Sequence, residues 1–130
     1  MLHNILIVDS NRSLLASHQS LLLQAGYKVA IAQNISAASM QLRSTLYSLV
    51  IAELALPESD PIDEVNLIRQ VRTLRPGTPI LVLTSNTNPA SHRRARDLGV
   101  WDISIKPTPS TELLSLAKNI LHEAYPEHSV

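Results

Sequence analysis

Three short runs of Ile, Val and Leu constrain the fold of this chain more than any other feature of its sequence. They cover Ile5–Val8, Leu49–Ala52 and Ile80–Leu83, and each is nearly continuous rather than alternating. Strands have continuous apolar sequences when helices cover both faces of a parallel sheet, because neither face is then exposed to water. The three runs are therefore predicted to be central strands. Two weaker and more polar runs, Tyr27–Ile31 and Trp101–Ile105, are predicted to be edge strands of the same sheet.

Segments with helical spacing lie between these runs. The order of strand then helix, five times over, predicts an α/β fold: a parallel sheet with right-handed crossovers and helices on both faces. Ser10 or Asn11 could cap the first helix and Gly26 could end it. Asp60 and Pro61 would begin the third helix. The apolar residues expected on the inward faces of the five helices are, in order, Leu14, Leu21, Leu22 and Ala25; Ile35, Ala38, Leu42 and Leu46; Val65, Ile68, Val71 and Leu74; Ala95 and Leu98; and Leu113, Leu116, Ala117, Ile120 and Leu121.

Size and charge predict one domain that does not bind nucleic acid or membranes directly. At ~150 residues per domain, the 130 residues suit a single unit, which we assign to residues 1–124, with a polar, frayed tail at 125–130. Eleven Lys and Arg residues match eleven Asp and Glu residues, so the net charge is zero. The chain has no Cys, and no apolar run approaches the ~20 residues that span a bilayer, so we expect a cytoplasmic location. The five His residues lack metal-ligand spacing and are expected on the surface.

Polar residues follow the predicted strands. Asp9 comes after the first run, Glu53 after the third and Thr84 after the fourth, while Lys106 follows the fifth. In an open parallel sheet, ligands bind outside the carboxyl ends of the strands, where the strand order reverses. A single charged residue at a strand end usually only marks the surface. Because four such residues occupy equivalent positions, we expect them to converge on one site.

These residues lie in blocks that resemble those of response-regulator receiver domains. The blocks are Ile5–Asp9, Leu49–Pro57, Ile80–Thr84 and Lys106–Pro107, in order and suitably spaced over residues 4 to about 122. The resemblance implies a flavodoxin-like (βα)5 three-layer sandwich with a five-stranded parallel sheet of order 2-1-3-4-5. In that family an acid pair after the first strand holds Mg²⁺, and an Asp ending the third strand accepts a phosphoryl group. A Thr or Ser and a Lys before a cis-proline contact the phosphoryl oxygens, and an aromatic ring on the fifth strand reports the state.

The chain departs from the family pattern at three of six positions. Ser10 stands where the second acid is expected, Glu53 stands at the phosphoacceptor position, and Ile103 replaces the switching aromatic residue. Ser10 could serve only as a helix cap, and Ile103 could simply pack. The three residues that match the family are Asp9, Thr84 and Lys106.

Charge and geometry at these positions argue against ordinary phosphorylation. Two carboxylates and one ammonium leave a charge of minus one, where the family has minus two, which weakens the attraction for Mg²⁺. We expect weak or no Mg²⁺ binding, with Asp9 as a vestigial ligand, and no other cofactor. Glu also places its carboxylate roughly 1.5 Å further out than Asp, and a misplacement of ~1 Å can cost ~10²-fold in rate. Glu53 would either hold Lys106, together with Thr84, as a permanent phosphate mimic or form a merely structural ion pair.

The favoured function is an atypical receiver, not an enzyme, that signals by binding without phosphorylation. Its partner would be another protein or a second copy, docked through the fourth helix, fifth strand and fifth helix, and a histidine kinase is a further candidate. The expected output residues are Arg93, Arg94, Arg96 and Trp101. A solvated helix face is the commoner explanation for such a group of arginines. The alternatives are a competent receiver that takes a phosphoryl group on Glu53 or on a hydroxyl such as Ser10, and a flavin-binding flavodoxin relative.

Overall fold

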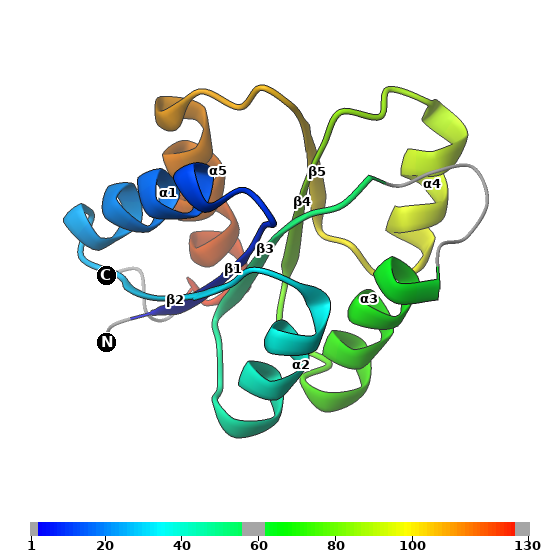
Figure 1. The fold of residues 1–130 in the computed structure, drawn as a ribbon, viewed down its shortest axis with the longest axis horizontal. Coiled ribbons are helices and arrows are strands. Elements are labelled where there is room, and N and C mark those ends of the chain that lie inside the picture. The colour runs from blue at the N-terminus through cyan, green and yellow to red at the C-terminus, as the bar shows by residue number, and fades with distance from the viewer. Residues whose placement is uncertain (1–2, 56–61, 127–130) are drawn as a thin grey trace.

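The predicted α/β architecture is present in the computed structural model of the chain, which describes residues 3–55 and 62–126, with only the backbone of 62–65. Five parallel strands form one sheet in the order β2-β1-β3-β4-β5, so the predicted fold class and strand order are confirmed (Figure 1). The strands are β1 (Asn4–Val8), β2 (Lys28–Ala32), β3 (Leu49–Glu53), β4 (Ile80–Thr84) and β5 (Asp102–Ile105). The helices are α1 (Arg12–Gln24), α2 (Ile35–Ser44), α3 (Ile62–Leu74), α4 (Pro89–Asp97) and α5 (Ser110–Ala124).

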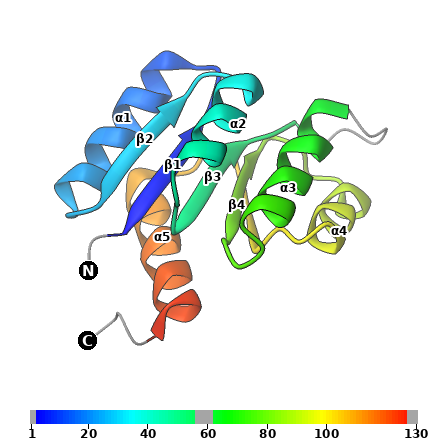
Figure 2. The ribbon, with the colours of Figure 1, turned by 90° about the horizontal axis from the view of Figure 1, so that it is seen from below.

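The sheet separates two hydrophobic cores. Helices α1 and α5 cover one face, and α2, α3 and α4 cover the other (Figures 1 and 2). Along β1, Ile5 and Ile7 pack in the core under α1 and α5, whereas Leu6 and Val8 pack in the core under α2, α3 and α4. All four side chains are buried. The three central runs are therefore continuous because alternate residues enter opposite cores.

Local signals fix where the helices begin and end. Asn11, not Ser10, caps α1, because its Oδ1 accepts the backbone N–H of Leu14 at 3.1 Å. Asn34 caps α2 and Asn88 caps α4 in the same way. Gly26 follows α1 with a φ of +99°, a left-handed conformation that glycine adopts without strain. The expected start of α3 at Asp60 and Pro61 lies outside the described residues.

The inward face of α2 is shorter than predicted. We expected Leu46 on that face, and this is wrong: the helix ends at Ser44, and Leu46 is 72% exposed. Thr45 adopts an extended conformation, which ends the helical periodicity before it reaches Leu46. Tyr47 is buried instead, where the chain turns into β3.

Two further differences concern α1 and the C-terminus. The most buried residues of α1 are Leu15, His18 and Leu22, so the inward face is centred one position away from the predicted Leu14 and Leu21. Tyr125, which we assigned to the frayed tail, is held in place: its hydroxyl donates to the backbone carbonyl of Ser48 at 2.8 Å. Among the described residues, no helix is long and apolar enough to cross a membrane.

Candidate functional site

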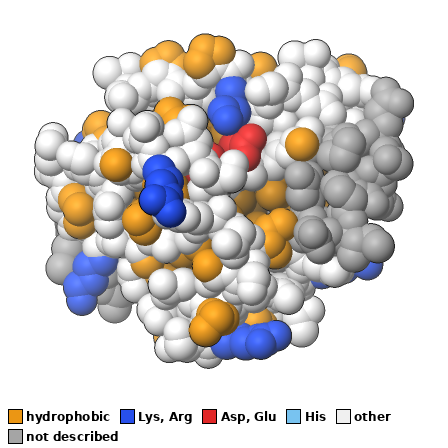
Figure 3. Space-filling view, viewed as in Figure 1, with side chains coloured by type: hydrophobic (Ala, Val, Ile, Leu, Met, Phe, Trp, Pro, Cys, Tyr) orange, Lys and Arg blue, Asp and Glu red, His pale blue; other side chains and the backbone are white. Residues whose placement is uncertain are grey.

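The structure places the four polar residues at the carboxyl ends of neighbouring strands. Asp9 follows β1, Glu53 ends β3, Thr84 ends β4 and Lys106 follows β5. The backbone N–H of Lys106 donates to the carbonyl of Thr84 at 2.7 Å, and Lys106 Nζ lies 3.4 Å from Glu53 Oε1. In the space-filling view, acidic atoms lie in a hollow near the centre of this face, beside a basic side chain (Figure 3).

Glu53 and Lys106 form the ion pair of this site. Their side chains are 28% and 24% exposed, so water reaches both. The 3.4 Å contact is longer than the 2.7–2.9 Å of a strong charge-assisted hydrogen bond. Screening and desolvation offset most of the attraction in such a pair, and its net contribution to stability is about 1 kcal/mol or less. The contact therefore matters more for where it holds Lys106 than for the stability of the fold.

Asp9 is the buried carboxylate of the site. It is 3% exposed, and its Oδ1 accepts the backbone N–H of Asn11 at 2.9 Å, just before the N-terminus of α1. This backbone donor at the start of the helix stabilises the negative charge of Asp9. The second oxygen, Oδ2, is buried and has no hydrogen-bond partner among the described residues. Buried polar atoms without partners are uncommon in folded proteins, so Asp9 retains an unused capacity to accept.

Thr84 is fully buried, and its hydroxyl turns toward the neighbouring loops. Thr84 Oγ1 donates to the carbonyl of Ala55 at 3.4 Å and accepts the backbone N–H of Asn86 at 3.1 Å. A hydroxyl has a single proton to donate. Because that proton is directed to Ala55, Thr84 does not donate to Glu53, and the part of the phosphate-mimic hypothesis that includes Thr84 lacks support in this geometry.

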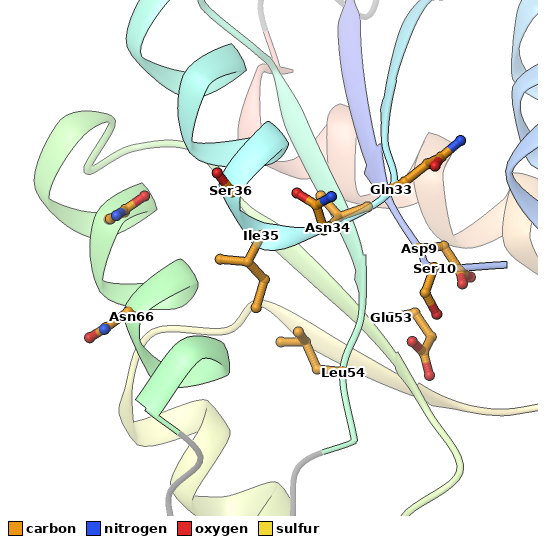
Figure 4. Close-up of a pocket in the computed structure, with 11 residues that line it drawn as sticks. Asp9, Ser10, Gln33, Asn34, Ile35, Ser36, Glu53, Leu54 and Asn66 are labelled. Atoms are coloured by element: carbon orange, nitrogen blue, oxygen red, sulfur yellow. The ribbon is translucent and has the colours of Figure 1, made fainter. Parts of the chain in front are cut away.

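The two remaining substituted positions differ in exposure. Ser10 is exposed and lies beside Asp9 and Glu53 at one end of a cavity (Figure 4). Ile103 is half-buried and packs against the core beneath α2, α3 and α4. It therefore fills the role expected of a β-branched residue in a strand, and no aromatic ring occupies this position.

Sequence reasoning missed one titratable group near the site. His18 was expected on the surface with the other histidines, but it is buried on the inward face of α1. Burial lowers the pKa of His18, the charge of Asp9 opposes that shift, and the charge of Lys106 adds to it. The signal was present in the sequence, because His18 lies three residues after Leu15 and four before Leu22 on one helical stripe.

The predicted output residues lie on α4 and next to β5. Arg93 and Arg96 are exposed, and Arg96 lies 3.9 Å from Asp102. Trp101, just before β5, is 43% exposed, and Ile105 at the end of the strand is 41% exposed. Arg94 is partly buried. This part of the surface thus combines positive charge with two large apolar side chains.

The described residues contain no group of three or more His, Cys, Asp and Glu side chains that could hold a metal ion. Near the strand ends, Asp9 supplies one unpartnered oxygen, and Glu53 is already paired with an ammonium. Ser10 supplies a neutral hydroxyl. Mg²⁺ requires near-octahedral oxygen ligands and gives up its water reluctantly, so the described residues fit this ion poorly.

Comparisons with known proteins agree with the fold and identify the family whose sequence model this chain matches. The family model for the response regulator receiver domain matches residues 5–118. The transcriptional regulatory protein ZraR of Klebsiella oxytoca is 30% identical over 128 residues, which cover 98% of this chain and 28% of that protein. This chain thus spans little more than a quarter of that relative. The transcriptional regulatory protein DltR of Streptococcus agalactiae is 29% identical over 111 residues, or 85% of this chain and 48% of DltR.

Solved structures give the same picture. A CheY-like response regulator receiver domain protein from Methanospirillum hungatei JF-1 superposes with a TM-score of 0.86 at 25% identity, covering 98% of this chain and 99% of the other. The chemotaxis response regulator CheY4 of Vibrio cholerae gives a TM-score of 0.81 at 23% identity, with 92% and 99% covered. The second likeness is one of fold.

Proposed function

This chain belongs to the response regulator receiver domain family, and we propose that it acts there as a pseudo-receiver, a binding module that signals without phosphorylation. Receiver domains are signalling modules that exchange signals with histidine kinases and partner proteins. Because the receiver family model matches residues 5–118, this assignment replaces the alternative of a flavin-binding flavodoxin relative. What sets this chain apart within the family is its substituted pocket.

The contact between Lys106 and Glu53 carries the proposal. In the family, this lysine position contacts a phosphoryl oxygen on the aspartate at the end of the third strand. Here the longer Glu53 side chain brings its own carboxylate oxygen to 3.4 Å from Lys106 Nζ. Lys106 therefore has an anionic partner without a phosphoryl group. Glu53 acts as a fixed partner of Lys106 alone, because the hydroxyl of Thr84 is engaged with Ala55.

Charge supports the same proposal. Phosphoryl transfer depends on positioning and on a metal ion that neutralises the transferred group. Ser10 removes one carboxylate from the pocket, and Lys106 offsets the charge of Glu53, which leaves Asp9 as the only uncompensated charge among these residues. The residues therefore offer a divalent ion neither the charge nor the oxygen ligands that it needs.

The output of the domain is binding through α4, β5 and α5. Trp101 and Ile105 supply exposed apolar area, and Arg93 and Arg96 supply positive charge beside it. Tryptophan and arginine are enriched among the residues that dominate binding energy at protein interfaces. The partner is another protein or a second copy of this chain.

Intact-mass measurement after incubation with phosphoramidate and Mg²⁺ tests the proposal. The natural chain is expected to gain no phosphoryl group. A gain of one phosphoryl group would support the alternative, an acceptor at Glu53 or at the exposed hydroxyl of Ser10. A Ser10→Ala variant then separates these two acceptors, because only modification of Ser10 would disappear.

A further inference from the structure

A cavity of about 580 Å³ extends from the substituted pocket into the space between α2 and α3. Asp9, Ser10 and Glu53 form one end, Asn66 on α3 lies at the other, and the start of α2 lies between them (Figure 4). Sites for small organic ligands usually measure about 300–1,000 Å³, and this cavity falls within that range. A single metal ion would fill only a small part of it.

The charge of the cavity favours a cationic ligand. Its described lining includes two carboxylates, Asp9 and Glu53, and no Lys, Arg or His side chain. Lys106 lies outside the lining and offsets Glu53 through Oε1. The net charge of Asp9, Glu53 and Lys106 is therefore minus one. A single positive charge cancels it, whereas the charge of a divalent ion exceeds it. Asp9 is 3% exposed and its Oδ2 has no hydrogen-bond partner, so this carboxylate lacks the compensation that buried charges normally have.

The other residues that line the cavity favour a ligand with hydroxyl groups. Asn34 uses its side-chain oxygen to cap α2. Its side-chain NH₂ group remains as a donor, and the exposed amide of Asn66 adds another donor and an acceptor. Ile35 and Leu54 add an apolar part of the lining between Asn66 and the carboxylates (Figure 4). Such a lining suits a short carbon skeleton that carries hydroxyl oxygens.

We propose that this cavity binds a small hydroxylated primary amine of the size of an amino sugar, with its ammonium group at Ser10 and Glu53. The ammonium contacts the exposed Ser10 and the half-buried Glu53, and it balances the buried charge of Asp9 through the protein interior, where charges are weakly screened. The hydroxyl groups accept from the amides of Asn34 and Asn66. The proposal rests on the proposed function in one respect, namely that Lys106 remains paired with Glu53.

Glucosamine, titrated into the ¹⁵N-labelled full chain at a pH where its amine is protonated, is the test. We expect saturable shifts in the NMR signals of the side-chain NH₂ groups of Asn34 and Asn66. Glucose, which lacks the charge, should bind at least tenfold more weakly, and Mg²⁺ should not compete. Ethanolamine tests whether the ammonium and one hydroxyl suffice.

Variants test which charges the amine recognises. Asp9→Asn keeps the acceptor for Asn11 but removes the charge, and Glu53→Gln removes the half-buried carboxylate. Each variant should bind glucosamine at least tenfold more weakly. Asp97→Asn, on the exposed side of α4, makes the same change in net charge and should leave affinity unchanged. Thermal unfolding of each variant confirms that it is folded.

The proposal is overturned if neither glucosamine nor ethanolamine gives saturable shifts, if glucose binds as tightly as glucosamine, or if both pocket variants, when folded, bind like the natural chain. The mass measurement above is independent of these results. A phosphorylated chain would overturn the proposed function, whereas an unphosphorylated chain that ignores both amines would overturn only the ligand assignment.

Discussion

Replacing Ser10 and Glu53 together by Asp is expected to create a magnesium site that Glu53→Asp alone does not create. Ser10→Asp adds the missing carboxylate next to Asp9. Glu53→Asp shortens the side chain at position 53, so its carboxylate moves away from Lys106 to the position that the family's aspartate occupies. The pocket then holds three carboxylates and one ammonium, and its charge changes from minus one to minus two.

The magnitude follows from the geometry. Shortening the side chain by roughly 1.5 Å moves the carboxylate from 3.4 Å to roughly 5 Å from Lys106 Nζ, which lowers their attraction from about 5 to about 3.3 kcal/mol at an effective dielectric of ~20. A new carboxylate ~4 Å from a divalent ion contributes about 8 kcal/mol at the same dielectric, before the cost of removing water from Mg²⁺. Even if dehydration cancels most of this, about 1.4 kcal/mol suffices for a tenfold change in Kd.

Isothermal titration with Mg²⁺ measures the effect. The double variant should bind at least tenfold more tightly than the natural chain, and Glu53→Asp alone should change Kd little. Ser17→Asp combined with Glu53→Asp is the matched control, because Ser17 is exposed on α1 and the net charge of the chain is the same. If the double variant binds Mg²⁺ no better than this control, pocket charge does not explain the substitutions at Ser10 and Glu53.

Three further predictions concern stability. Asn11→Ala removes the cap of α1 and should lower the free energy of unfolding by about 1 kcal/mol in urea denaturation, and an unchanged midpoint would show that the cap is dispensable. Gly99→Ala should lower it by more than 1 kcal/mol, because φ is +106° and the new Cβ would lie 2.7 Å from Arg72 Cδ; Gly77→Ala, which meets nothing within 4 Å, is the control and should change little. The pKa of His18 is lowered in the folded chain, so the unfolded chain binds more protons and stability should fall as the pH drops below the ordinary histidine value of 6.5. His18→Gln should flatten that slope between neutral and mildly acidic pH, and an equal slope in both proteins would contradict the assignment.

The fold was predictable from the sequence because its strongest signals are local and repeated. A run such as Ile5–Val8 is apolar throughout only when both faces of the strand are covered, and five alternations of strand and helix leave few topologies. Leu46 was misplaced because apolar spacing continues past the residue where the backbone leaves the helix. His18 was misplaced because its residue type was weighed without its position on the stripe between Leu15 and Leu22.

The position of the site was also predictable, since each polar residue ends a strand and parallel strands end at one edge. Its internal contacts were not. The hydroxyl of Thr84 bonds to Ala55 and Asn86, and the backbone path of two loops sets those contacts rather than any spacing in the sequence. The cavity beside the pocket was likewise absent from the sequence pattern, because Asn34 and Asn66 meet there only through the packing of α2 against α3.

The most direct measurement is a magnesium titration of the unaltered chain, followed through the backbone amide signals of Asp9, Ser10 and Glu53. A pocket that offers Mg²⁺ one free carboxylate beside the neutral hydroxyl of Ser10 should give no saturable shifts at millimolar Mg²⁺. Saturation of these signals, with a crystal structure that shows a six-coordinate ion bridging the ends of β1 and β3, would contradict that claim.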